Sequence, residues 1–153
     1  MQEFRILNAD NIDPARLAVI RVEAMKPSLE ALGRFDPERA RNRFLETYVP
    51  ADTQIVMAGN ELIGFFVVRT QPDHLYLDHI YMRTAQQGGG IGRRIVRSVQ
   101  DRAKDMGLQV RLMALRNSPA NDFYVSCGFV LQRCDEIDNH YTWEPTQAAS
   151  HQQ

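Results

Sequence analysis

The sequence predicts a mixed α/β fold: a mostly antiparallel sheet of six to seven strands flanked by about four helices. Three observations predict it. The spacing of apolar residues changes from a helical to a strand period after residue 50. Gly59-Asn60 separates two strand-like runs, as in a two-residue hairpin. A glycine-rich loop then joins a strand to an amphipathic helix and a further strand, which indicates one β-α-β crossover rather than a doubly wound parallel fold.

The first strand and helix are read from alternation and capping. Phe4 and Ile6 alternate with polar residues and predict a short strand. Asp13-Pro14 places a capping carboxylate before a proline at the first helical position. Apolar residues follow at helical spacing: Leu17, Ile20 and Ala24. Pro27 is expected to stop this helix.

Asp36-Pro37 repeats the helix-start signal. The next residues on one helical face are Ala40, Phe44 and Tyr48. Pro50 is expected to end this second helix. The change of period then predicts strands over residues 54–58, 62–69 and 75–82.

A long helix is expected after the glycine loop, ending near Gly107. Its predicted buried face comprises Ile91, Ile95, Val96, Val99, Ala103 and Met106. Strands over 108–115, 129–132 and 141–143, with a short helix over 118–128, complete the predicted elements. We expect a single domain over residues 1–145 and a flexible polar tail over 146–153.

Composition excludes several classes of protein. Of 153 residues, 44% are hydrophobic, and 18 Lys and Arg against 19 Asp and Glu give a net charge of −1, which argues against a dedicated nucleic-acid binder. The longest apolar run, residues 62–68, is too short to span a membrane, and the N-terminus has no signal-peptide pattern. Two cysteines rule out a disulfide scaffold, so a cytoplasmic location is expected.

No metal site is expected. His74, His79, Cys127 and Cys134 match no zinc-ligand spacing. Cys127 is also a weak candidate nucleophile, because nothing in the sequence lowers the pKa of its thiol.

Four of the nine glycines lie at Gly88, Gly89, Gly90 and Gly92, between a strand and a helix. This arrangement forms an anion site, because orphan N–H groups and the helix dipole favour negative charge. Arg93 and Arg94 follow, with no acidic residue before Asp101, so they either face a bound polyanion or lie solvated. A Walker loop would need Lys-Ser or Lys-Thr after Gly92, and a dinucleotide fingerprint would need glycine where Ile95 stands.

Two motifs carry a family resemblance. Gln87-Gly88-Gly89-Gly90-Ile91-Gly92 fits the pattern Gln/Arg-x-x-Gly-x-Gly/Ala of the GNAT superfamily of N-acetyltransferases. Asn117-x-x-Ala120-x-x-x-Tyr124-x-x-x-Gly128-Phe129 resembles the second acetyl-CoA motif of that superfamily. The order of elements is similar too, so the resemblance covers nearly the whole chain. One departure is Thr84, where many members carry proline; Thr84 shapes only the start of the loop.

The resemblance implies an acetyl-CoA site. Backbone amides from Gln87 through Gly88, Gly89, Gly90, Ile91 and Gly92 to Arg93 would bind the pyrophosphate. The backbones of Ile80 and Met82 would pair with the pantetheine arm, to which Asn117 would also hydrogen-bond. Tyr124 would lie near the thioester sulfur and protonate the leaving thiolate; its alternative role is packing under the sheet.

The acceptor amine must lose a proton before it attacks, since its pKa is about 10. Strand alternation places Tyr76, Asp78, Ile80 and Met82 on one side, and Leu75, Leu77, His79 and Tyr81 on the other. The Met82 side should face the thioester, so Asp78 is the preferred base, with a structural hydrogen bond or salt bridge as its alternative role. His79 and a water chain remain alternative bases.

We therefore predict transfer of an acetyl group from acetyl-CoA to a primary amine of a small molecule, peptide or protein, by direct attack in a ternary complex. The alternatives are a non-catalytic acyl-CoA-binding sensor or partner-binding module, and an enzyme using a longer acyl-CoA. Residues 32–37 occupy the region that lines the acceptor pocket in this superfamily, where Arg34 and Phe35 are either acceptor contacts or a solvated and a core residue. No nucleic-acid or membrane partner is expected, and a homodimer stays open because no pattern identifies an interface.

Overall fold

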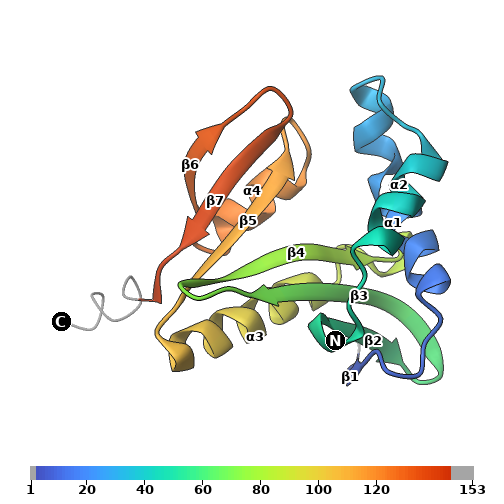
Figure 1. The fold of residues 1–153 in the computed structure, drawn as a ribbon, viewed down its shortest axis with the longest axis horizontal. Helices are drawn as coiled ribbons and strands as arrows, with labels where there is room; N and C mark the ends of the chain where they lie inside the picture. The colour runs from blue at the N-terminus through green and yellow to red at the C-terminus, as the bar shows by residue number, and fades with distance from the viewer. Residues whose placement is uncertain (1–2, 146–153) are drawn as a thin grey trace. The chain divides into compact units, whose positions relative to one another are not determined.

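The computed structural model describes residues 3–145, which contain seven strands and four α-helices in the predicted order (Figure 1). The strands are hydrogen-bonded in the order β1-β2-β3-β4-β5-β7-β6. Strands β1 and β2, β2 and β3, β5 and β7, and β6 and β7 pair antiparallel, whereas β4 and β5 pair parallel. This confirms the mixed, mostly antiparallel sheet. The predicted tail, residues 146–153, lies outside the described residues.

The described chain divides into two compact units. The first unit covers residues 3–67 and 79–92, and the second unit covers residues 68–78 and 93–145. Three elements contribute to both units: β3 (Glu61–Thr70), β4 (His74–Met82) and α3 (Ile91–Met106). The single domain expected over residues 1–145 stays a prediction.

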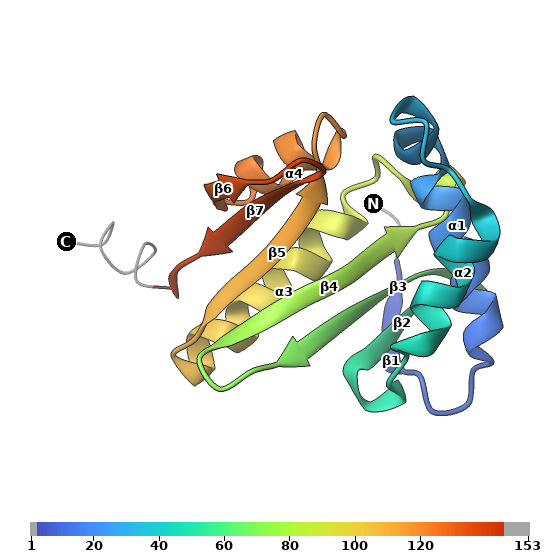
Figure 2. The same cartoon turned by 45° about the horizontal axis from the view of Figure 1, so that its top comes forward.

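The first unit begins with β1 (Arg5–Asn8), α1 (Pro14–Ala31), α2 (Pro37–Glu46) and β2 (Thr53–Ala58), with the 3₁₀ turn η1 (Pro50–Asp52) before β2. Both predicted caps form: the Asp13 side chain accepts a bond from the Ala15 amide at 2.9 Å, and that of Asp36 from the Arg39 amide at 3.1 Å. Helices α1 and α2 lie side by side (Figures 1 and 2).

Both proline stop signals place a helix end wrongly. Pro27 lies inside α1, which continues to Ala31. A proline removes one helical hydrogen bond, and tertiary contacts of the residues before it offset that loss: an Arg21 guanidinium N–H donates to the Ala40 carbonyl, and the Tyr81 hydroxyl donates to Met25 Sδ at 3.4 Å. Helix α2 ends at Glu46, earlier than Pro50 suggested.

The core of the first unit joins both helices to β2 and β3. Phe44 of α2 is its central aromatic residue, with its ring centroid 5.2 Å from that of Phe65 in an edge-on arrangement. Tyr48 lies beyond the end of α2, but its ring still packs 5.7 Å from Phe44. The remaining buried members are Ala9, Leu17, Ala18, Ile20, Ile55, Leu62 and Val67.

The second unit contains most of α3, followed by β5 (Gln109–Leu115), α4 (Ala120–Ser126), β6 (Val130–Cys134) and β7 (Asp138–Trp143). The predicted apolar face of α3 is buried at Ile91, Ile95, Val96, Val99 and Ala103. Met106 was wrongly assigned to that face: it is 47% exposed, because it occupies the last position of the helix. Among residues 3–145, no helix is both long and apolar enough to cross a membrane.

Candidate functional site

Strand β4 carries three of the predicted site residues, and its side chains alternate in burial over most of its length. Leu75, Leu77 and His79 are buried, whereas Tyr76, Asp78 and Ile80 are half-buried. The alternation fails at the end of the strand, where Tyr81 is half-buried and Met82 is buried.

Met82 therefore does not share the environment predicted for the Asp78 side of the strand. Gly64 of β3 explains its burial: a Cβ at Gly64 would lie 2.5 Å from Met82 Sδ. The thioether fills the space that the missing side chain leaves. Only the main chain of Met82 is then suited to a ligand, which is the role that the resemblance implies.

The turn after β4 is held by several hydrogen bonds within the first unit. The Arg83 amide donates to the Ile63 carbonyl at 2.8 Å, and Gln87 Nε2 donates to the Met82 carbonyl at 3.2 Å. Between them lies the 3₁₀ turn η2 (Thr84–Gln86), where both the amide and the hydroxyl of Thr84 donate to Glu23 Oε1, at 3.3 and 3.0 Å. The start of the glycine loop is thus fixed to β3, β4 and α1.

The glycine loop itself is exposed from Gln87 to Gly90. Gly88 and Gly90 both have φ of +84°, a conformation that side chains with a Cβ disfavour. A Cβ at either position would meet nothing within 4 Å, so backbone conformation rather than space requires glycine here. Ile91 is buried and starts α3, whose first turn has no acidic residue. A loop of this kind at a helix N-terminus is suited to a phosphate group.

Arg93 has a specific hydrogen-bond partner in the second unit. The sequence analysis had expected its side chain either to face a bound polyanion or to lie solvated. Its guanidinium donates to the hydroxyl and carbonyl of Ser126, at 2.7 and 3.3 Å, and lies 5.7 Å from the ring centroid of Phe123. Ser126 ends α4, where a cation complements the helix dipole. The side chain of Arg93 therefore has a structural role, and only its amide remains a candidate for the ligand.

Tyr124 lies in an aromatic cluster of the second unit and is 8% exposed. Its ring is 5.3 Å from Phe123, 5.8 Å from Phe129 and 6.4 Å from Tyr141, between centroids. The packing role that the sequence left as an alternative is therefore present. The role of the hydroxyl as an acid stays a prediction.

Two asparagines, Asn117 and Asn121, lie at the turn between β5 and α4. Asn117 is exposed with φ of +68°, a left-handed conformation that asparagine tolerates. Asn121, which the sequence analysis missed, donates to the carbonyls of Leu115 and Ser118 at 2.8 and 2.9 Å. Its Oδ1 accepts from the Tyr141 hydroxyl at 2.8 Å. An Asn in the first turn of a short helix was the available signal, because such residues bond to nearby backbone.

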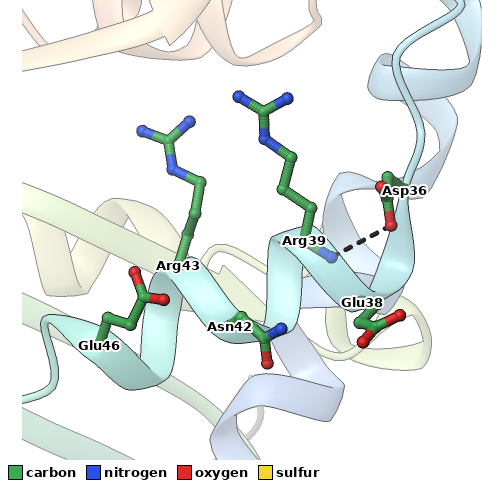
Figure 3. Close-up of a pocket in the computed structure, with 6 residues that line it drawn as sticks. All are labelled: Asp36, Glu38, Arg39, Asn42, Arg43 and Glu46. Atoms are coloured by element: carbon green, nitrogen blue, oxygen red, sulfur yellow. Dashed lines mark hydrogen bonds between the residues drawn. The ribbon is translucent and has the colours of Figure 1, made fainter.

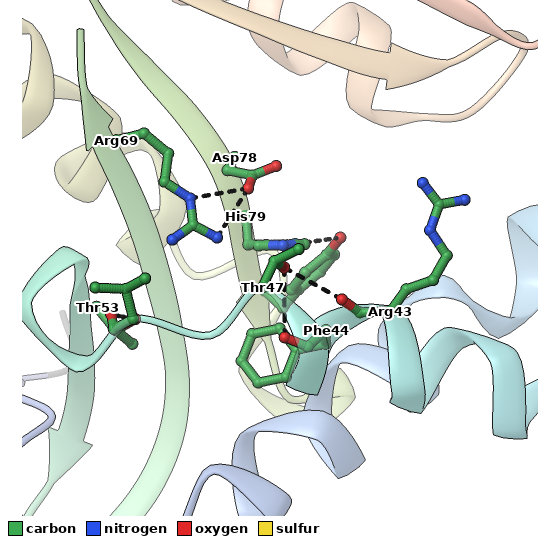
Figure 4. A network of polar contacts seen from close by, with 9 residues as sticks. Arg43, Phe44, Thr47, Thr53, Arg69, Asp78 and His79 are labelled. Carbon is green, nitrogen blue, oxygen red and sulfur yellow. Dashed lines mark hydrogen bonds and ion pairs between the residues drawn. The ribbon is translucent and has the colours of Figure 1, made fainter.

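Asp78 forms an ion pair with Arg69 in the second unit (Figure 4). A salt bridge of this kind is the structural role that the sequence analysis gave as an alternative. Asp78 Oδ2 lies 3.2 Å from Nε and 3.1 Å from Nη2 of Arg69, and the aspartate side chain is 27% exposed. The pKa of the neighbouring Tyr76 is raised to about 12, chiefly by burial and further by Asp78 and Asp138. The carboxylate is thus in a partly buried, polar setting.

His79 belongs to the first unit and packs against α2 (Figure 4). Its ring lies edge-on to Phe44, with centroids 5.4 Å apart, and its Nδ1 is 3.4 Å from the Tyr81 hydroxyl. This confirms the expectation that His79 faces the core or a helix. At 9% exposure it is one of two buried polar residues in residues 3–145.

The predicted acceptor segment leads into an open, charged surface. Arg34 is exposed, and Phe35 is half-buried with Lys26 Nζ 5.8 Å from its ring centroid. Beyond it, the outer face of α2 borders a hollow of about 330 Å³. Arg39 and Arg43 extend in the same direction from successive turns, with Asp36, Glu38, Asn42 and Glu46 around them (Figure 3).

Within residues 3–145, no three His, Cys, Asp or Glu side chains cluster as metal ligands would. Burial raises the pKa of the Cys127 thiol, and Arg93 offsets that only in part. A raised pKa lowers the thiolate fraction, which does not favour Cys127 as a nucleophile.

The predicted site residues thus fall in both units. Ile80, Met82 and residues 87–92 belong to the first unit; Asp78, Arg93, Asn117 and Tyr124 belong to the second.

A family model for the acetyltransferase (GNAT) family matches residues 21–129, which include β4, the glycine loop and α4. The chain belongs to the GNAT acetyltransferase family. No curated protein matches the chain. Membership of the GNAT family confirms what the two motifs predicted.

Solved structures of acetyltransferases share this fold. The PaiA N-acetyltransferase of Thermoplasma acidophilum, in complex with coenzyme A, is similar with a TM-score of 0.71 and 18% identity, covering 94% of this chain and 99% of that one. The ribosomal-protein-S18-alanine N-acetyltransferase of Escherichia coli is similar with a TM-score of 0.67 and 17% identity, covering 93% of this chain and 94% of that one. An acetyltransferase of Thermus thermophilus is similar with a TM-score of 0.69 and 18% identity, covering 94% of this chain and 97% of that one.

Proposed function

We propose that this GNAT protein binds acetyl-CoA and transfers its acetyl group to a primary amine. The observation that carries the proposal is the exposed glycine loop at the start of α3, in which Gly88 and Gly90 adopt positive φ. Its amides would bind the pyrophosphate of the cofactor, from Gln87 to Arg93. The coenzyme A complex of the Thermoplasma acidophilum protein supports this assignment through the shared fold.

The rest of the binding site follows from the family motif. The main chains of Ile80 and Met82 would pair with the pantetheine arm, and Asn117 would bond to it from the turn after β5. Burial of the Met82 side chain supports a purely main-chain role for that residue. The exposed position of Asn117 leaves its amide group available to a ligand.

In the reaction, the neutral amine attacks the thioester carbonyl, the carbon–sulfur bond breaks, and the thiolate takes a proton. Tyr124 would donate that proton, and the amide of Met82 would stabilise the oxyanion. The ammonium proton would pass to Asp78, to His79 or to a water chain. Asp78 remains our preferred base, although its ion pair with Arg69 must loosen before it can act.

Calorimetric titration with acetyl-CoA tests the proposal, with dephospho-CoA and ATP as controls. We expect micromolar binding that weakens more than about tenfold in Gly90→Asp, because a side chain at positive φ is strained and its charge repels the pyrophosphate. Gly33→Asp, at a positive-φ glycine outside the loop, is the matched control and should bind normally. Absence of acetyl-CoA binding to the unmodified protein would overturn the proposal.

A non-catalytic acyl-CoA sensor is the alternative, and amine-dependent release of free thiol separates the two. An enzyme releases coenzyme A when a suitable amine is added; a sensor binds acetyl-CoA and releases none with any amine in a broad panel. Asp78→Asn and His79→Gln, compared by the pH profile of kcat, then identify the base. The cytoplasmic location stays a prediction.

A further inference from the structure

We propose that Glu23 of α1 is a positioning residue that holds the glycine loop ready for its ligand. The inference rests on the proposed function, because acetyl-CoA is the ligand assigned to that loop. It concerns a residue outside both sequence motifs, on a helix that precedes the loop by a second helix and three strands.

The contact is a cap supplied from another element. Glu23 Oε1 accepts from both the amide and the hydroxyl of Thr84, at 3.3 and 3.0 Å. Thr84 is the first residue of η2, and Arg83, which precedes it, makes no side-chain cap hydrogen bond. The first amides of a helical turn have no partner within the turn. A carboxylate satisfies one of them here, as a capping aspartate does at an ordinary helix start.

Hydrogen bonds within the turn connect Thr84 to the start of the glycine loop. The Gln87 amide donates to the Thr84 carbonyl at 3.3 Å, and the Gln86 amide to the Arg83 carbonyl at 2.8 Å. Gln87 is the first residue of the glycine motif, and its side chain is bonded to the Met82 carbonyl. Fixing Thr84 therefore fixes where the exposed, glycine-rich segment begins.

The backbone at this turn suits proline, which explains why threonine needs a partner. Arg83 has φ of −59° and ψ of 148°, the extended conformation that a residue before proline adopts. Proline at the first helical position would set φ by its ring and leave no N–H to satisfy. Threonine has no ring to set φ, and its N–H needs an acceptor. Glu23 supplies that acceptor, which receives hydrogen bonds from both the amide and the hydroxyl of Thr84.

Glu23 can be replaced without damage to the core. Its side chain is exposed and lines a surface hollow of about 190 Å³, together with Arg16, Val19, Ile20, Leu62 and Arg83. Shortening it removes the two hydrogen bonds and opens no internal cavity. Glu30, also exposed on α1, is the matched control.

The test compares Glu23→Ala with Glu23→Gln, Glu30→Ala, Thr84→Pro and the double variant Glu23→Ala/Thr84→Pro. We expect Glu23→Ala to weaken acetyl-CoA binding about fivefold, and Glu23→Gln to retain most of it, because the amide oxygen still accepts from Thr84. In the Thr84→Pro background, Glu23→Ala should change the affinity less than about twofold, since no donor remains. Glu30→Ala should match the unmodified protein.

A second measurement needs no ligand. Hydrogen exchange of the amides of residues 86–92 should be faster in Glu23→Ala than in Glu30→Ala, and should return in the double variant to the rate of Thr84→Pro alone. Equal exchange and equal affinity in Glu23→Ala and the unmodified protein would overturn the inference. A Glu23→Ala effect of the same size in both backgrounds would also overturn it, since Glu23 would then act through α1 alone. Failure of the unmodified protein to bind acetyl-CoA overturns the proposed function instead, and the exchange rates still decide the role of Glu23.

Discussion

The two units differ in what each offers to a ligand. The first unit offers main chain: the glycine loop and the end of β4, where Met82 is buried. The second unit offers side chains: Tyr124 in its aromatic cluster, Asp78 with Arg69, and Asn117 on its turn. A main-chain site depends on backbone conformation, whereas a side-chain site depends on chemical identity. The same kind of substitution should therefore have different consequences in the two units.

The largest expected effect is a loss of stability in the first unit. In Gly64→Val, the Cβ would lie 2.5 Å from Met82 Sδ and 2.6 Å from the Tyr81 carbonyl oxygen, which cannot move freely. We expect unfolding by urea to show a loss of about 3 kcal/mol, typical of a forced overpacking. Gly59→Ala, at a turn with nothing within 4 Å of the new Cβ, should cost about 1 kcal/mol. Equal losses in the two variants would mean that the approach of β4 to Gly64 is not limiting.

The second effect should change the rate and leave the fold intact. Tyr124→Phe keeps the ring in its cluster and removes the proposed acid, so kcat should fall about a hundredfold with little change in the KM for acetyl-CoA. Tyr141→Phe is the matched control, since it removes the hydroxyl that donates to Asn121. That variant should lower stability by about 1 kcal/mol and leave kcat within about twofold. Unchanged turnover in Tyr124→Phe would remove Tyr124 from the mechanism.

A smaller effect is expected where α3 meets α4. Arg93→Met keeps an apolar stem and removes the bonds to Ser126, so thermal unfolding should show a loss of about 1 kcal/mol. The pKa of the Cys127 thiol should rise further, because the charge that partly lowers it is gone. Slower alkylation of Cys127 at neutral pH would show this rise; an unchanged rate together with unchanged stability would contradict the structural role of Arg93.

The smallest effect is a shift in a titration. Asp78→Asn should lower the pKa of Tyr76 from about 12, but not to its ordinary value of about 10, since burial is the larger cause. A raised pKa in the folded state gives stability that is complete below about pH 10 and is lost as the pH rises through 12. Ultraviolet titration, with Tyr76→Phe subtracted to isolate this residue, measures the shift. If Asp78→Asn leaves the titration unchanged, Asp78 exerts no field on that face of β4.

Local signals in the sequence predicted the elements and the loop well. The caps at Asp13 and Asp36, the turn at Gly59 and the order of elements are confirmed, because each depends on residues close together in the chain. Pro27 misled the end of α1 because contacts distant in sequence support that helix. Helix α2 ends before Pro50, where the Thr47 hydroxyl donates to the carbonyls of Arg43 and Phe44. Alternation failed at Met82 because Gly64, on another strand, left space for a buried thioether.

The two sequence motifs of the candidate site could be predicted, but the residues that hold them in place through tertiary contacts could not. Gln87 to Gly92 and Asn117 to Phe129 stand out as patterns. Glu23 and the partner of Arg93 do not, because an exposed glutamate and a serine at the end of a helix have no distinctive spacing. Their importance comes from the atoms that they meet in the folded chain.

The proline inside α1 gains meaning from its distance to Glu23. Pro27 has no N–H to donate to the carbonyl four residues earlier, which is that of Glu23. Helices are often kinked at such a position. Glu23 thus combines two features: its carbonyl receives no hydrogen bond from residue 27, and its carboxylate accepts two hydrogen bonds from Thr84.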